Sequence, residues 1–455
     1  MAHVDVDINN IQEQFSFSGD LKKKILGIGG LGVLVLVIGI VMLMFGGGHG
    51  HEEHHAALEA AANVASVASD GHGHAADVAA HAEGGEHHGG FHWTTVLKTN
   101  LWMNAVYFIG IALLGFFFFT IQFAANAGWS TPVQRIMLNF GRFIPIGGAI
   151  LLVAFLIGNH DIFHWTHSYL FDPTSPEFDP VIKGKEGFLN LPFYLVRMVV
   201  FVAVWTVFFF MLNKLSTNED LHVGSTVHFR RTQRISVAFL IFFGVSESIA
   251  SWDWIMSIDT HWYSTLFGWY CLASWLVTAV SSITLVAVIL KEMGYLKIVN
   301  ENHFHDLGKF IFGFSIFWSY LFLAQFLLIY YANIPEETIY FIERLRSGNY
   351  FWIFVTMLLF NFVMPFFIMM TRDAKRKTMF LKIVTVVIII GHWLDFYLMI
   401  TPGVLKENGG MTLSAIGMGL VFLSGFAYVI FNGLTKAGLI PQNHPMIEEG
   451  IYHHT

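Results

Sequence analysis

Ten long apolar segments constrain the fold of this chain more than any other feature of its sequence. Each is long enough for a helix to cross a hydrocarbon layer about 30 Å thick. Only 13% of the residues are charged, whereas about a quarter are charged in soluble domains. We therefore predict an all-α, polytopic membrane protein with about ten transmembrane helices. The predicted spans are 25–45, 101–124, 136–157, 191–212, 233–250, 266–290, 308–331, 350–370, 380–400 and 412–432.

Individual spans carry further signals. Pro145 and Pro365 lie inside the third and eighth spans, where a kink is expected. The fifth span is the shortest and most polar. The first span follows a long polar lead and exceeds the usual core of a signal peptide, so we expect a retained membrane anchor.

The distribution of Lys and Arg predicts the orientation of the chain. Sixteen of the 25 Lys and Arg residues fall on the side of the N-terminus, six fall on the opposite side and three lie within spans. Cytoplasmic loops are normally the ones enriched in these residues. We therefore expect both termini in the cytoplasm.

Residues 251–265, between the fifth and sixth spans, form the most unusual connection. Three Trp and one Tyr accompany Asp253, Asp259 and His261 there, and the orientation places them on the outer side. Trp and Tyr favour the membrane–water interface, whereas acids beside it are costly unless they are paired, hydrated or functional. The segment is either an aromatic-anchored loop or part of a functional site.

Ionisable residues also occur within or at the ends of spans, at a similar distance from the outer face. His392 and Asp395 are spaced i, i+3, on one helical face. A charge at mid-membrane costs roughly 2.5–3.5 kcal/mol, so such groups should face the interior and find partners. We expect Arg197 to pair with Glu247. The layer is either a set of ion pairs that fix helix packing, or a proton path or quinol-headgroup site.

The sequence therefore predicts proton-path candidates but no catalytic, cofactor-binding or metal-binding residue. The candidates are Glu247, Asp253, Asp259, His261, His392, Asp395, His160 and Arg197.

Cofactor signals are weak. Cys271 is the single cysteine, so thiolate metal sites and c-type haem attachment are excluded, and the chain is expected to bind no haem.

Residues 46–92 hold ten of the 23 histidines in an Ala- and Gly-rich background, in which 56–69 could form a short helix. Such a segment is a flexible loop or, less favourably, a metal-binding one. The net charge of −7 argues against nucleic acid as a partner.

A weak internal repeat suggests how the spans are grouped. The run Arg230-Arg231-Thr232 opens the fifth span and Arg376-Lys377-Thr378 opens the ninth, and each is followed by a glycine and then buried polar residues. Spans two to five and six to nine would then be two four-helix units. The expected organisation is a cytoplasmic segment 1–24, a first span 25–45, a periplasmic loop 46–100, bundles 101–265 and 266–411, a last span 412–432 and a cytoplasmic tail 433–455.

Three stretches resemble one known family. The Phe-Ser-Phe-Ser-Gly lead at 15–19, the Lys-rich entry to the first span and the motif SWDWIMSIDTHWYSTLFGWY at 251–270 are similar to the ActF family of membrane subunits of alternative complex III. That complex is a bacterial quinol:cytochrome c oxidoreductase. The resemblance covers 100–432 and the N-terminal span, and leaves out the His-rich loop.

The resemblance implies an NrfD/PsrC-like fold with two four-helix bundles plus flanking helices. It also implies partner subunits: an NrfD-like quinol-binding subunit, an iron–sulfur/molybdopterin-like subunit, and multihaem and monohaem cytochromes c that carry the haem c. In that family the quinol site is usually assigned to the other NrfD-like subunit. We therefore expect a subunit without its own redox cofactor or independent enzymatic activity, in contact with lipids, contributing to proton translocation or to quinol-site architecture. The alternatives are a structural scaffold and a metal-ion transporter fed by the His-rich loop.

Overall fold

The computed structural model describes residues 13–46, 92–222 and 224–454, and all regular secondary structure within these ranges is helical. Ten stretches of helix in this part of the chain are long and apolar enough to cross a membrane, which confirms the predicted all-α, polytopic class. They consist of α1 (Gly19–Gly46), α4 (Trp93–Ala124), α5 (Gln134–Phe140) continued by α6 (Ile144–Ile162), α8 (Leu191–Glu219), α9 (Val227–Trp254), α10 (Phe267–Glu292), α11 (Glu301–Ala332), α13 (Gly348–Leu358) continued by α14 (Met364–Met369), α16 (Thr378–Leu405) and α17 (Leu413–Leu434).

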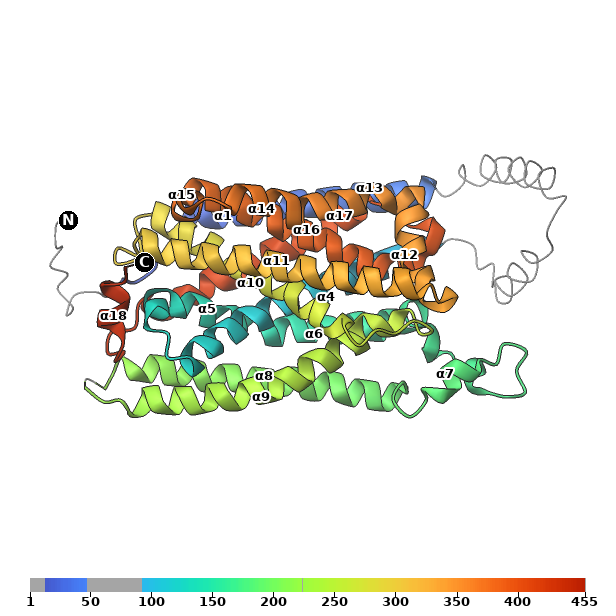
Figure 1. Cartoon of the computed structure of the whole chain (residues 1–455), viewed down its shortest axis with the longest axis horizontal. Helices are drawn as coiled ribbons and strands as arrows, with labels where there is room; N and C mark the ends of the chain where they lie inside the picture. The colour runs from blue at the N-terminus through green and yellow to red at the C-terminus, as the bar shows by residue number, and fades with distance from the viewer. Residues whose placement is uncertain (1–12, 47–91, 223, 455) are drawn as a thin grey trace.

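The spanning helices lie side by side along the long axis of the molecule (Figure 1). Short helices cover both ends of this bundle. Helices α7 (Pro180–Gly184) and α12 (Pro335–Arg346) lie at one end, called here the α7/α12 end. Helices α15 (Arg372–Arg376) and α18 (Ile447–Ile451) lie at the other, the α15/α18 end, together with the C-terminus. The remaining short turns are η2 (Gly128–Val133), η3 (Gly141–Phe143), η4 (His164–Thr166), η5 (Ser168–Phe171), η6 (Met256–Ile258), η7 (Leu359–Val363) and η8 (Lys406–Asn408).

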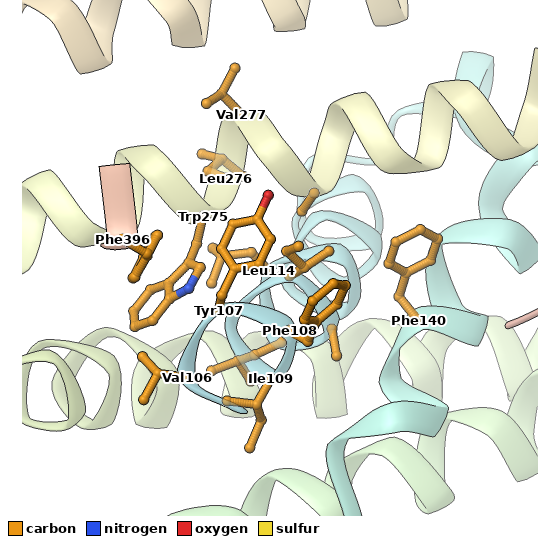
Figure 2. Close-up of a cluster of buried hydrophobic side chains, with 14 of the residues drawn as sticks. Val106, Tyr107, Phe108, Ile109, Leu114, Phe140, Trp275, Leu276, Val277 and Phe396 are labelled. Carbon is orange, nitrogen blue, oxygen red and sulfur yellow. The ribbon is translucent and has the colours of Figure 1, made fainter. Parts of the chain in front are cut away.

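Helices α4 and α10 form the centre of the bundle and are almost entirely buried. Gly110 of α4 allows their close approach, because a Cβ there would lie 1.8 Å from the Trp275 ring of α10. Figure 2 shows Trp275 beside Phe396 of α16, and these two rings stack with centroids 5.0 Å apart. Tyr107 of α4 donates a hydrogen bond to the Ile389 carbonyl of α16 at 2.6 Å. The three central helices therefore form a tightly packed aromatic core.

Helix α4 contacts α6 and α9 on one side and α10 and α16 on the other. Helix α8 packs on α6 and α9, and α11 packs on α10 and α14.

The predicted domain boundaries at residues 265 and 411, and the predicted division into two bundles, stay predictions. The His-rich region and the Ala-rich run 56–69 lie outside the described residues, except for His92 at the start of α4.

Backbone contacts at glycine hold α1 against α17. A Cβ on Gly39 would lie 2.3 Å from the Ser414 backbone nitrogen, and one on Gly417 would lie 2.3 Å from that of Leu36. Small residues allow such close approach between helices in membranes, where van der Waals packing drives association. The Ser424 hydroxyl adds a hydrogen bond to the Ile25 carbonyl at 2.7 Å. The first span is thus an integral part of the bundle.

The helices depart from regular α geometry next to Pro145 and next to Pro365. A 3₁₀ turn at η3 ends two residues before Pro145, and the π-helical turn η7 ends two residues before Pro365. Each proline lacks the N–H that would bond to the carbonyl four residues earlier, so the preceding turn adopts another hydrogen-bond pattern. The kink expected at each proline stays a prediction.

Candidate functional site

The eight predicted residues do not form one layer. The structure brings His392 and Asp395 together on α16, and Arg197 of α8 with Asp253 of α9. The other four are Glu247, Asp259, His261 and His160, and each of these has surroundings of its own.

Asp395 is the centre of a buried polar network. It is 1% exposed and accepts hydrogen bonds from Tyr270 of α10, from Ser274 of α10 at 2.9 Å and from Trp318 of α11 at 2.9 Å. The spacing of Tyr270 and Ser274 by four residues places both on the face of α10 that meets α16. Two helices, α10 and α11, therefore supply three donors to one carboxylate on α16, and such donors are what an acid needs inside an apolar bundle.

His392 extends this network by one group. Its Nδ1 lies 2.8 Å from the Ser274 hydroxyl and 3.6 Å from the Asp395 carboxylate. When Ser274 donates to Asp395, the Nδ1–H of neutral His392 donates to Ser274, and Nε2 is left as an acceptor. Nε2 is buried and makes no hydrogen bond in the described part of the chain. Tyr270, Asp395, Ser274 and His392 thus form a continuous hydrogen-bonded row.

A small cavity adjoins Asp395 on the side of the α7/α12 end. Its lining includes Tyr270, Gln325, Arg344 and Asp395, and its volume is about 20 Å³. That volume is enough for one water molecule, but too small for a quinol ring. Gln325 Nε2 is buried without a partner among the described residues, so the cavity offers hydrogen bonds to a water. Arg344 and Asp395 therefore face a common, water-sized space.

Arg344 of α12 closes the other side of this cavity. It is 3% exposed and donates to the carbonyls of Leu398 at 2.8 Å and Met399 at 3.3 Å, near the end of α16. Its guanidinium also lies 3.4 Å from Asp259 and 3.8 Å from Glu343. Burial and the negative charge of Asp259 raise the pKa of Glu343, although Arg344 opposes this. A carboxyl with a raised pKa therefore stands beside the cavity.

Glu247 has a different environment. Its side chain is 1% exposed, and its Oε1 has no hydrogen-bond partner among the described residues. The Cys271 thiol of α10 lies within electrostatic range of both Glu247 and Asp395. The Cys271 sulfur in turn lies 3.9 Å from that of Met399. Glu247 is thus a buried acid without a cationic partner among the described residues.

The predicted pairing of Arg197 with Glu247 is wrong. Arg197 instead forms a two-armed ion pair with Asp253, with both arms 2.8 Å long. The prediction ended the fifth span at residue 250, whereas α9 continues to Trp254 and carries Asp253 on its last turn. Arg197 lies in the second turn of α8, so its side chain extends toward this end of α9. The rings of Phe188 and Phe193 cover the guanidinium, with centroids 3.9 and 4.3 Å away.

The remaining candidates lie nearer the surface. His261 is 57% exposed on its side chain and its Nε2 lies 2.6 Å from Asp179, the cap of α7. Partial burial works against ionisation of Asp179, but the backbone N–H of Ile182 and the charge of His261 hold its pKa below the usual value. His160 contacts Thr166 at 3.2 Å. These contacts organise the α7/α12 end without entering the bundle.

Sequence reasoning did not identify Tyr270, Ser274, Trp318 or Arg344. The signal for the first two was present, because a Tyr and a Ser four residues apart in an apolar span mark one polar stripe. Arg344 gave no such signal, since it lies in a short polar helix that looks like an ordinary loop.

The described residues contain no group of three His, Cys, Asp or Glu side chains that could hold a metal ion. No protein-family model matches the chain, and a search of curated proteins finds no significant relative.

Proposed function

We propose that this chain is a proton-conducting integral membrane subunit, and that it belongs to a respiratory quinol:cytochrome c oxidoreductase of the alternative complex III type. The observation that carries the first part is the buried row Tyr270–Asp395–Ser274–His392 beside a water-sized cavity. A carboxylic acid, an imidazole and hydroxyls in hydrogen-bond contact are the groups through which proteins pass protons in membranes.

The route toward the α7/α12 end is supported by the groups on either side of the cavity. Asp395 and Arg344 both line it, and Glu343 and Asp259 lie next to Arg344. One water in the cavity would connect the Asp395 network to this acidic end. Side-chain relays of this kind can couple to the membrane potential, because moving one charge through 100 mV is worth about 2.3 kcal/mol.

Assignment to the complex rests on the sequence resemblance at residues 15–19 and 251–270. In this proposal the termini are cytoplasmic and the α7/α12 end faces the periplasm of a bacterial inner membrane. Quinol oxidation takes place in the NrfD-like partner subunit, and haem c and iron–sulfur clusters are carried by other partners. The chain itself supplies the proton route.

The proton role is tested by Asp395→Asn and Glu247→Gln in the intact complex, reconstituted in sealed vesicles. We expect turnover with quinol and cytochrome c, or the membrane potential formed per turnover, to fall by about tenfold or more for Asp395→Asn. Glu292→Gln, which changes a half-exposed acid paired with Lys382, is the matched control. If both variants keep the turnover and the potential of the unmodified complex, the relay is excluded and a packing role remains.

Membership of the complex is tested separately, by purifying the tagged chain from native membranes in mild detergent. We expect cytochromes c and an iron–sulfur subunit to co-purify in fixed ratio. Isolation of the chain without any haem protein would contradict the assignment to a respiratory complex, while leaving the proton route open.

One observation favours the second candidate, a structural scaffold. The Arg197–Asp253 pair has every charged atom close to a partner, because Arg197 also donates to the Phe188 carbonyl at 3.0 Å. A saturated pair of this kind fixes helices α8 and α9 and does not exchange protons readily. We therefore assign Arg197 and Asp253 to packing, and Asp395, His392 and Glu247 to proton transfer.

A further inference from the structure

A second polar cavity lies at the α15/α18 end of the bundle, far from the Asp395 network. It is formed between α5, η3, the C-terminal part of α8 and the end of α17, and its volume is about 30 Å³. Its polar lining includes Arg135, Asn139, Arg142, Asn213 and Thr217. With Ser216, which also lines the cavity, two arginines and four neutral polar side chains therefore converge at this end of the bundle.

The two arginines differ in how they are neutralised. Arg135 has a counter-ion, because its Nη2 lies 2.6 Å from the Asp220 carboxylate. Arg142 has none among the described residues, and its Nε donates a hydrogen bond to Asn139 Oδ1 at 3.0 Å. Arg135 Nε is also buried without a partner in this part of the chain. The cavity thus has more donors than acceptors, and an unneutralised positive charge.

Backbone packing leaves the space for these side chains. A Cβ on Gly433 would lie 2.2 Å from Asn139 Oδ1 and 2.7 Å from Arg142 Nε. The absence of a side chain at this position of α17 therefore allows Asn139 and Arg142 to point together into the cavity. Asn213 and Thr217 are one helical turn apart on α8, so they present their polar groups on the same side.

The position of the cavity along α8 indicates what kind of anion it suits. Phe210 and Met211, just before Asn213, are 55% and 44% exposed and belong to the apolar outer face of the bundle. The fourth span predicted from the sequence ends at residue 212, so the polar lining at Asn213 and Thr217 lies at the level where lipid headgroups are expected. The distribution of Lys and Arg predicts that this end is cytoplasmic, and that leaflet carries the anionic lipids.

We infer that this cavity binds the phosphate group of an anionic phospholipid, with Arg142 as the main ligand. Arginine forms paired, charge-assisted hydrogen bonds with phosphate oxygens, and the Asn213 amide adds a neutral donor. The Thr217 hydroxyl and the Asn139 amide already donate to backbone carbonyls, so they shape the cavity without binding the ligand. The acyl chains would lie along the exposed apolar face of α8. The inference is independent of the proton route, because it concerns the opposite end of the molecule.

The test uses the purified full-length chain, stripped of lipid and returned to nanodiscs of phosphatidylcholine with or without phosphatidylglycerol. Retained phosphatidylglycerol is counted by native mass spectrometry after release from the disc, and thermal unfolding is followed in parallel. We expect Arg142→Gln to lower the affinity for phosphatidylglycerol about fivefold or more. Lys214→Gln, which removes an exposed cation from the same stretch of α8, is the control and should retain the lipid.

Two further variants separate the charge of Arg142 from the polar lining around it. Arg142→Lys keeps the charge and should retain part of the affinity, whereas Asn213→Leu should lower it even if Arg142→Gln does not fold. Equal lipid retention by the unmodified chain, Arg142→Gln and Asn213→Leu would overturn the proposal. Inorganic phosphate that protects the chain as well as phosphatidylglycerol does would show a free-phosphate site and overturn the lipid assignment.

Discussion

Arg197 and Asp253 meet as a two-armed ion pair where α8 begins and α9 ends, with each arm 2.8 Å long. Both side chains are buried, at 7% and 2% exposure. Taking two charges out of water is costly, and the remaining partner is left unpaired when one is removed. The pair therefore holds the two helices in one relative position more strictly than apolar contacts would.

We expect Arg197→Leu to destabilise the protein by roughly 3–5 kcal/mol, because it leaves the Asp253 carboxylate buried and alone. Thermal unfolding in nanodiscs measures this. The double variant Arg197→Leu/Asp253→Leu should recover most of the loss, since no uncompensated charge remains. A single variant as stable as Lys183→Gln, which breaks an exposed pair with Glu186, would show that the ion pair does not fix the helices.

Neutralising Glu247 should not destabilise the protein, in contrast to Arg197→Leu. It is buried without a cationic partner among the described residues, so the isosteric, neutral Glu247→Gln removes a group whose charged form is costly there. We expect unfolding of the variant at the same or a higher temperature than the unmodified chain, together with impaired proton transfer. Loss of stability equal to that of Arg197→Leu would contradict this and indicate a structural charge.

The spans were predictable because each depends on local composition. A run of about twenty apolar residues identifies a membrane helix whatever its neighbours are. Pro145 and Pro365 likewise act on the turn directly before them. The end of α9 was less predictable, since the polar residues Ser251 and Asp253 look like a loop in sequence. The last turn of the helix is held by Arg197 of α8, which binds Asp253, and by Trp102 of α4, which donates to the Trp254 carbonyl.

The site was predictable only in part, because sequence indicates contacts within one helix but not contacts between helices. His392 and Asp395 are spaced on one helix, so their proximity follows from sequence. The identity of their partners depends on how α10 and α11 are rotated against α16, which no local pattern determines. Arg344 was missed because its position depends on carbonyls at the end of α16 and on Asp259, more than fifty residues away in both directions.

The Tyr270 hydroxyl contributes to the Asp395 network from one side. Tyr270→Phe removes that donor and leaves Ser274 and Trp318 in place, each 2.9 Å from the carboxylate. We expect a stability loss of about 1 kcal/mol, typical of one hydrogen bond, together with slower proton translocation in the intact complex. Tyr194→Phe, which loses a bond to the Asp253 carbonyl, is the matched control and should not slow translocation. Equal translocation rates in both variants would remove Tyr270 from the relay.

Close packing of α1 on α17 predicts sensitivity to side-chain size at the glycines. Gly417→Val would place its Cβ 2.3 Å from the Leu36 backbone nitrogen, so the helices must separate. We expect a loss of roughly 2 kcal/mol or more, as for overpacked sites, and earlier proteolysis of α1. Gly425→Val, on the same helix but with no atom within 4 Å of its Cβ, is the control. An unchanged α1 in the Gly417 variant would show that this contact does not hold the first span.

Docking of the C-terminal segment at the α15/α18 end should depend on pH through His444. Burial, and then the positive charge of Arg135, lower the pKa of His444 to about 4, and its Nδ1 accepts the Met446 N–H at 3.2 Å. The detached segment binds a proton below about pH 6.5, whereas the docked one does so only below about 4. The free energy of docking is therefore most favourable above pH 6.5. It becomes less favourable by about 1.4 kcal/mol for each pH unit between 6.5 and 4.

Limited proteolysis of residues 441–454 across this pH range measures the effect. We expect cleavage to accelerate as the pH falls from 6.5 to 4 in the unmodified chain. The variant His444→Asn offers an uncharged side-chain acceptor two residues before Met446, and its cleavage should be independent of pH. Equal acceleration in both proteins would mean that another group controls docking of the segment.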